Sequence, residues 1–295
     1  MELFLLSLAL LTARADSVAV RDIQVAQGET LRTTTSGSGR PVVLIPGIFG
    51  GAFSYRKVTG PLAARGYRTT VVEPLGFGAS SHPKKADYSF DAQSRRVAHT
   101  LEQMGIKHAL LIGQGSGAGI AFRLATDRPD LVRGLLSIDG GPAETPATPE
   151  MKRLFKLGIW PLKLMMDPPR ARHELRDELT SNSGDTTWVT DQVVQRYAQG
   201  QIDDIHGSLD ALHQMSKVKE GDSLVDRLHH CTVPVLLLVG DAPHRIQVPA
   251  EEVDLLEQRL SRFSAERVAG AGQYIQEEQP QVVVGALARL DRLAS

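Results

Sequence analysis

The stretch ALLIGQGSGAG at residues 109–119 joins a short apolar run to a loop rich in glycine. Its first four residues are all apolar, as is typical of strands buried on both faces of a parallel sheet. Gly117 to Thr126 then has the apolar spacing of a helix. A buried strand, a tight glycine turn and a helix in succession predict one βα unit of a layered α/β protein.

The same alternation of strand and helix patterns extends from this stretch in both directions. Val18 to Val25 and Thr30 to Thr35 predict two paired opening strands, followed by a turn at Gly37-Ser38-Gly39. Further strands are expected at Val42 to Ile45, Arg68 to Val72, Ala109 to Ile112, Leu135 to Ile138 and Val233 to Val239, and helices at Val58 to Arg65, Phe90 to Met104, Gly117 to Thr126, Glu251 to Leu260 and Gln281 to Leu293. This order predicts a mostly parallel, doubly wound sheet covered by helices.

The stretch from residue 141 to residue 230 interrupts this rhythm. It has three prolines near its start and then several helical patterns. We therefore expect a helical cap at 141–230, inserted into a core formed by residues 16–140 and 231–295.

The first fifteen residues have a composition of their own. Leu3 to Leu11 is apolar except for Ser7, and Ala13-Arg14-Ala15 follows as a small-x-small cleavage pattern. Residues 1–15 therefore predict a signal peptide and a secreted or periplasmic protein. The alternative is an apolar N-terminal helix that packs on the domain of a cytoplasmic protein. The run is too short to span a bilayer, which needs about 20 residues.

Composition excludes several classes of function. The 295 residues include 33 Lys and Arg against 34 Asp and Glu, and 42% are hydrophobic, which predicts a globular core rather than disorder. Without a basic excess, we expect no nucleic-acid partner. Cys231 is the single cysteine, so an internal disulfide and a cysteine-rich metal site are excluded, and no metal is predicted.

The loops after the strands carry the most information, because ligands bind beyond the carboxyl ends of parallel strands. These loops are PGIFGG at residues 46–51, EPLGFGAS at 73–80, GQGSGAG at 113–119, VGD at 239–241 and GAGQ at 270–273. Their order and spacing resemble the α/β-hydrolase superfamily of the AB hydrolase-1 type over nearly the whole chain. The glycine-rich turn also resembles, locally, the non-catalytic N-myc downstream-regulated family.

The resemblance implies a nucleophile at the apex of a strand-to-helix turn and an oxyanion hole of two backbone N–H groups. Gly113 and Gly117 match the flanking glycines, which puts Gly115, without a side chain, at the nucleophile position. The backbone donors would be Ile48 and Ser116. Ser116 is an alternative nucleophile, but one further residue in a helix turns a side chain by about 100°. It is otherwise expected to cap or begin the helix.

The acid and the base of such a triad are also displaced. Gln273 stands at the implied histidine position, and an amide cannot accept a proton near neutral pH. Pro243 stands at the implied acid position. Asp241 lies too early, whereas Asp139 follows the preceding strand and is either an alternative acid or a structural residue. His244 lies on the rim and is either a substitute base, with Asp139 or Asp241 as its orienting acid, or an ordinary loop histidine.

A dinucleotide-binding outline overlaps the same residues. Gly113-x-Gly115-x-x-Ala118 follows a strand and opens a helix, and Asp139 follows the next strand. The hydrolase-like loops on both sides explain these residues equally well. We therefore expect no cofactor and keep an oxidoreductase as the less favoured reading.

The cap is expected to determine ligand specificity. Residues 151–166 are rich in bulky apolar side chains and methionine, which suit an apolar pocket lined by Phe49, Trp160 and Met165. Two alternatives are ordinary cap core and a basic amphipathic surface that touches anionic lipid.

These observations predict an α/β-hydrolase fold with a helical cap and a degenerate site. We expect it to bind a small, apolar, carbonyl-type ligand without standard serine-hydrolase turnover. The alternative is a rewired or residual esterase that uses Ser116 or a water molecule with His244 and Asp139 or Asp241.

Overall fold

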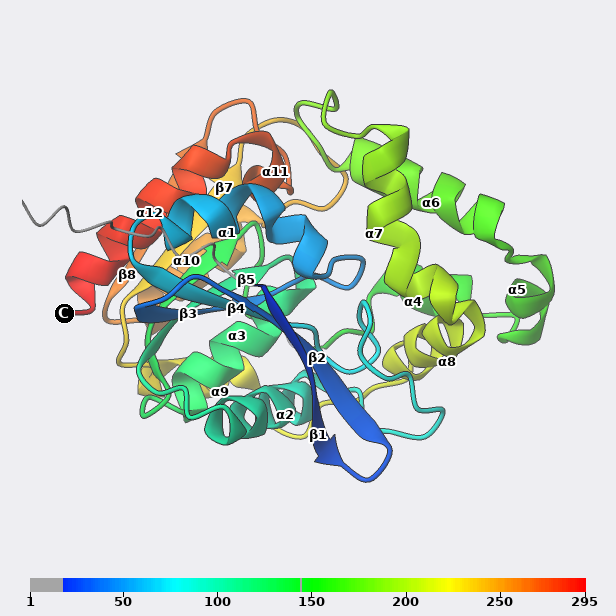
Figure 1. Cartoon of the computed structure of the whole chain (residues 1–295), viewed down its shortest axis with the longest axis horizontal. Coiled ribbons are helices and arrows are strands. Elements are labelled where there is room, and N and C mark those ends of the chain that lie inside the picture. Colours follow the sequence, from blue (N-terminus) through cyan, green and yellow to red (C-terminus); the bar gives the residue numbers. More distant parts are fainter. Residues whose placement is uncertain (1–17, 144) are drawn as a thin grey trace, which may run out of the picture.

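The computed structural model describes residues 18–143 and 145–295, which form an eight-stranded sheet with helices on both faces (Figure 1). The strand order is β1-β2-β4-β3-β5-β6-β7-β8. All pairs from β4 to β8 are parallel, and only β1 with β2 and β2 with β4 are antiparallel. The prediction of a mostly parallel α/β sheet is confirmed.

The strands lie where apolar, β-branched runs predicted them, with small differences at their ends. Their bounds are β1 Ala19–Ala26, β2 Glu29–Ser36, β3 Arg40–Ile45, β4 Tyr67–Val72, β5 Ala109–Gln114, β6 Val132–Ile138 and β7 Val235–Gly240. β8, Phe263–Val268, has no counterpart among the expected strands. It is an edge strand of sequence FSAERV with mostly exposed or half-buried residues, so it lacks the apolar signal of the central strands.

The central strands are apolar at successive positions because both faces of the sheet are covered. In β3, Val43 and Ile45 face one core, while Val42 and Leu44 face the other. The first core lies under α2 (Phe90–Gln103), α3 (Ser116–Asp127) and α10 (Ala250–Arg259), and the second under α1 (Arg56–Ala63), α11 (Ile275–Glu278) and α12 (Pro280–Leu293). This packing fixes the strand ends and the loops that follow them.

A second group of helices lies to one side of the sheet, at the right in Figure 1. It comprises α4 (Pro149–Leu154), α5 (Trp160–Met165), α6 (Pro168–Ser181), α7 (Asp191–Asp203) and α8 (Ile205–Met215). The chain returns through α9 (Leu224–Arg227) and the 3-10 turn Leu228–His230. Leu224 and Leu228 are fully buried in the core under α2 and α3, so this last part of the stretch expected to be the cap packs on the sheet domain.

Two features bear on membranes and export. The expected signal peptide at residues 1–15 lies outside the described residues. Within residues 18–143 and 145–295, no helix is both long and apolar enough to cross a bilayer.

Candidate functional site

The turn between β5 and α3 has the geometry of a nucleophile elbow, with Gly115 at its apex. Gly115 has φ 52° and ψ −122°, a conformation that glycine adopts without the steric cost of a Cβ atom. Its backbone N–H donates to the carbonyl oxygen of Ile138 at 3.0 Å. Gly117 permits close packing beneath the apex, since a Cβ there would lie 2.5 Å from the Ile45 carbonyl oxygen.

Gln273 lies opposite this apex. A Cβ atom built on Gly115 would lie 3.4 Å from Nε2 of Gln273, so positions 115 and 273 face each other directly. The Gln273 side chain is almost completely buried, and its amide has no hydrogen-bond partner in the part of the chain that the structure describes. Its backbone N–H donates to the Asn182 carbonyl oxygen at 2.8 Å, which ties this loop to the end of α6.

Glu278 holds the same loop from the other side. Its carboxylate accepts hydrogen bonds from the backbone N–H groups of Gly184 at 2.8 Å, Asp185 at 2.7 Å and Gly272 at 3.1 Å. Burial raises the pKa of Glu278 above its ordinary value. The Gln273 loop is therefore fixed by Asn182 at the end of α6 and by Glu278 of α11.

Ser116 lies one residue beyond the apex, at the start of α3. Its Oγ accepts a hydrogen bond from the backbone N–H of Ile48 at 2.9 Å. The backbone N–H of Ile48, one of the two expected oxyanion donors, is therefore already hydrogen-bonded to the Ser116 hydroxyl. Gln114 makes a similar contact with the same loop, because its Oε1 accepts a hydrogen bond from the backbone N–H of Gly47 at 3.3 Å. Together these contacts fix the loop after β3 against the elbow.

Asp139 and His244 form a buried pair next to the elbow. Asp139 follows β6, and its Oδ2 lies 3.0 Å from His244 Nε2, with both side chains fully buried. Asp139 Oδ1 accepts from the N–H of Gly240 at 3.0 Å, and His244 Nδ1 lies 2.7 Å from the Ala242 carbonyl oxygen. The hydrogen bond to Asp139 raises the pKa of His244.

Both nitrogens of His244 therefore face oxygen acceptors. A carbonyl oxygen and a carboxylate can only accept, so the contacts are satisfied by an imidazolium that donates from both nitrogens. In this state His244 has no free lone pair with which to take a proton from Ser116 or from a water molecule.

Asp241, the other candidate acid, serves a different loop. It is exposed, and its Oδ1 accepts from the backbone N–H of Gly270 at 2.6 Å. This contact joins the loop after β7 to the loop after β8.

The sequence did not single out Glu73, which organises the loops near the elbow. Its nearly buried carboxylate accepts from the N–H groups of Ala52 at 2.8 Å and Ala79 at 2.6 Å. Burial raises its pKa. The sequence signal for this role was an acidic residue directly after the apolar run of β4. Its hydrogen bonds show that Glu73 connects the loops after β3 and β4.

Aromatic side chains form a cluster between the cap and the core. Trp188, Tyr197 and Tyr274 are buried together, with Phe49 and Phe53 packed against them. Of the three expected pocket residues, Phe49 alone belongs to this cluster. Trp160 and Met165 lie on α5, with 80% and 53% of their surface exposed, at the far end of the cap in Figure 1.

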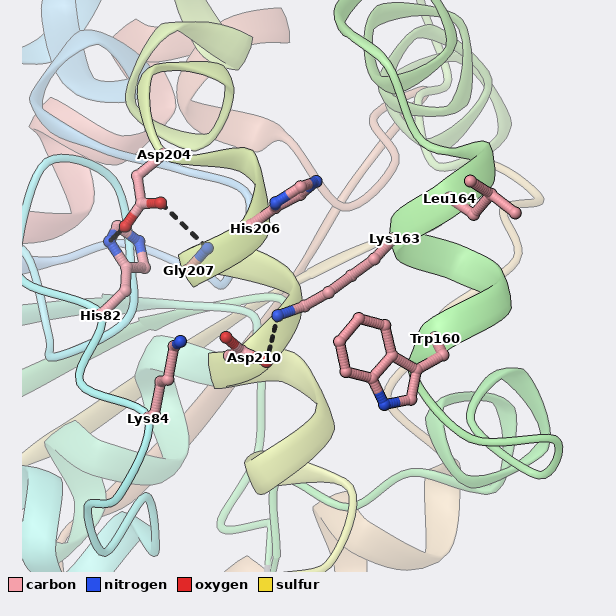
Figure 2. Close-up of a pocket in the computed structure, with 9 residues that line it drawn as sticks. All are labelled: His82, Lys84, Trp160, Lys163, Leu164, Asp204, His206, Gly207 and Asp210. Atoms are coloured by element: carbon pink, nitrogen blue, oxygen red, sulfur yellow. Dashed lines mark hydrogen bonds and ion pairs between the residues drawn. The ribbon is translucent and has the colours of Figure 1, made fainter.

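A separate cavity of about 570 Å³ lies between α5, α8 and the loop after β4 (Figure 2). Its lining combines cationic, acidic and apolar side chains: His82, Lys84, Trp160, Lys163, Leu164, Asp204, His206, Gly207 and Asp210. None of these residues belongs to the elbow.

Two observations bear on metal and dinucleotide binding. Within 18–143 and 145–295, no group of three or more His, Cys, Asp or Glu side chains is arranged to hold a metal ion. Asp139, which would hold a ribose in the dinucleotide outline, already binds Gly240 and His244.

Comparison with known proteins agrees with the observed fold. The family model described as alpha/beta hydrolase fold matches residues 40–242, more than half of the chain. The chain belongs to the α/β-hydrolase fold family. A solved epoxide hydrolase superposes on this α/β-hydrolase with a TM-score of 0.80 at 18% identity, covering 94% of this chain and 99% of that one.

Curated relatives match over shorter stretches. The 2-hydroxymuconate semialdehyde hydrolase of Pseudomonas sp. is 31% identical over 126 residues, which are 42% of this chain and 44% of that protein. Haloalkane dehalogenase 2 of Mycobacterium tuberculosis is 32% identical over 100 residues, 34% of this chain and 35% of that protein. The matched stretch is thus less than half the length of these relatives.

Proposed function

We propose that this α/β-hydrolase binds a small, largely apolar carbonyl compound at the elbow and does not turn it over through a serine acyl-enzyme. The observation that carries the proposal is the juxtaposition of Gly115 and Gln273. One position lacks a nucleophile, and the other lacks a base. Both residues lie where the family resemblance puts the nucleophile and the histidine.

Gln273 supports the binding half of the proposal. The Gln273 amide has no hydrogen-bond partner among the described residues and its Nε2 faces the apex, so Nε2 is available to donate a hydrogen bond to a ligand oxygen. Gly115 and Ser116 are only half-buried, whereas their neighbours Gln114 and Gly117 are buried, so the apex is reachable from solvent. The aromatic cluster beside it, with Phe49, suits an apolar ligand body.

The absence of a side chain at residue 115 supports the second part of the proposal, that the ligand is not turned over through a serine acyl-enzyme. In a serine protease that uses the same triad chemistry, loss of the nucleophile or the base alone costs a factor of about 10⁶ in turnover. The oxyanion donor at Ile48 is engaged by Ser116, so a ligand carbonyl reaches it only if that hydroxyl rotates away. Binding without a covalent step needs none of these groups.

The rewired-esterase alternative rests on the contact between Asp139 and His244. That contact brings two of its candidate residues together, and one curated relative, the semialdehyde hydrolase, is a hydrolase by name. It is less favoured because both His244 nitrogens face acceptors. The elbow itself supplies no nucleophile at residue 115.

Calorimetric titration with phenyl butyrate, a medium-chain lactone and methyl hexyl ketone tests the proposal. We expect saturable heat with at least one probe and no product in the recovered solution. Gly115→Leu should weaken binding about tenfold or more, because its side chain fills the space at the apex. Gly28→Leu is the matched control, since Gly28 is exposed, also has a positive φ, of 75°, and a Cβ atom there would meet nothing within 4 Å.

Two results would overturn the proposal. No saturable heat with any probe would remove the binding function. Release of acid from the ester at a rate abolished by His244→Ala would instead establish the rewired esterase.

A further inference from the structure

We propose that the outer edge of the cap docks on an anionic lipid surface through α4, α5 and the loop between them. The contact surface is an apolar ridge formed by Leu154, Leu157, Trp160, Leu164 and Met165. It lies at the far end of the cap from the sheet (Figure 1) and is independent of the elbow and of the function proposed for it.

The ridge is unusually exposed for apolar side chains. In the described part of the chain, these are five of the nine large apolar side chains with high exposure, and they fall within twelve consecutive residues. Leu157, Trp160 and Leu164 are 86%, 80% and 90% exposed. Isolated exposed leucines are ordinary, but several large apolar side chains exposed on one short segment indicate a contact surface for a protein or a membrane.

Charge favours a membrane over a protein surface. Lys152, Arg153 and Lys156 are exposed on the same segment, and none forms an ion pair with a side chain that the structure describes. Residues 149–170 contain five basic residues against two acidic ones, although the whole chain has a net charge of −1. Cations beside Trp and Leu form the combination that binds at the interface of anionic bilayers.

The ridge is held outward by contacts on its inner side. Lys163 Nζ lies 2.6 Å from Asp210 Oδ1 on α8, and Figure 2 shows it pointing toward that residue. Trp160 and Leu164 line the open cavity beside this contact and are 80% and 90% exposed. Phe155 is buried against His213, with ring centroids 5.0 Å apart. These contacts anchor the segment to α8 and leave Leu157, Trp160 and Leu164 exposed.

Trp160 is a built-in reporter of this docking. The chain has two tryptophans, and Trp188 is buried with Tyr197 and Tyr274. In a Trp188→Phe background, the fluorescence of the protein comes from Trp160 alone among tryptophans. Its emission should shift to the blue on addition of vesicles made of equal parts phosphatidylglycerol and phosphatidylcholine, and brominated acyl chains should quench it.

Charge variants test the electrostatic part. Lys152→Gln, Arg153→Gln and Lys156→Gln combined should weaken partitioning about tenfold or more, and added salt should weaken the wild type. The matched control is Lys85→Gln, Lys107→Gln and Lys217→Gln combined, three exposed lysines elsewhere that should leave binding unchanged. Each set removes three positive charges.

Apolar variants test the insertion part. Leu157→Ser and Leu164→Ser together should weaken binding to the mixed vesicles. Ile246→Ser and Leu293→Ser together, at other exposed apolar positions, should not. Circular dichroism of each variant establishes that the fold is retained.

Several outcomes would overturn the proposal. It fails if the vesicles do not shift Trp160 emission. It also fails if both ridge variants bind as tightly as wild type, since another part of the chain would then be the membrane contact. A blue shift that depends on protein concentration and not on vesicles would assign the ridge to a second copy of the chain.

Discussion

At the scale of single residues, the proposed function rests on Gly115 and Gln273. The backbone at Gly115 keeps the φ and ψ of a nucleophile elbow, but no side chain projects from it. Residues other than glycine in such a conformation carry strain of about 1–3 kcal/mol. Glycine avoids that strain, and the hydrogen bonds to Ser116 and Gln114 hold the neighbouring loop after β3 in place.

The Asp139–His244 pair should make stability depend on pH. The hydrogen bond to Asp139 raises the pKa of His244, so the folded state favours the protonated imidazole. Its stabilisation is complete below the ordinary histidine pKa of about 6.5 and is lost as pH rises through the raised value. The free energy of unfolding from urea titrations should therefore contain a component that falls above about pH 6.5.

His244→Gln should lack this component, since the amide does not titrate. His173→Gln, at an exposed histidine of α6, serves as the control and should keep the wild-type profile. If wild type and His244→Gln lose stability in parallel as pH rises, the buried ion pair is not the form present in solution.

The sequence could predict part of this residue-scale arrangement. The loop motifs matched Gly115 to the family's nucleophile position and Gln273 to its histidine position, because each residue lies in a loop that follows a strand. They left open whether Asp139 and His244 were catalytic or structural. These two residues are 105 positions apart, and only the assembled sheet brings their side chains together.

At the scale of elements, α7 of the cap is joined to α11 of the core through a buried polar contact. The Tyr197 hydroxyl donates to Glu277 Oε1 at 2.6 Å, and Arg56 and Lys57 of α1 neutralise the same carboxylate. Burial raises the pKa of Tyr197 well above its ordinary value, so its phenol remains the donor. The contact fixes the cap over the aromatic cluster.

Tyr197→Phe should therefore lower the free energy of unfolding by about 1.5–3 kcal/mol, the usual range for a hydrogen bond to a charged group. Tyr274→Phe is the matched control, because Tyr274 lies in the same cluster and its hydroxyl has no hydrogen-bond partner among the described residues. Urea titration measures both. Equal effects of the two substitutions would mean that packing, rather than the bond to Glu277, holds α7.

The elements themselves were predictable where their residues are buried on one stripe or on both faces. β8 was not, because an edge strand of sequence FSAERV has little apolar signal. The outward orientation of α5 was also hidden, since its apolar residues match cap core as well as a surface. Only the contacts of Phe155 and Lys163 with α8 decide which side of α5 faces inward.

On the scale of the whole molecule, the chain keeps the sheet order, elbow and loops of the α/β-hydrolase fold family. The proposed binding role and the proposed membrane contact lie at separate places on it, one under the cap and one on its outer edge. Either role can be disproved without the other.

Labelling by a fluorophosphonate probe tests the central claim most directly, because the reagent reacts with an activated serine and with little else. The purified wild type should gain no mass after prolonged incubation, while an active serine hydrolase in the same reaction is labelled completely. Stoichiometric addition of one probe to the peptide that contains Ser116 would contradict the claim and make that serine the nucleophile of a working hydrolase.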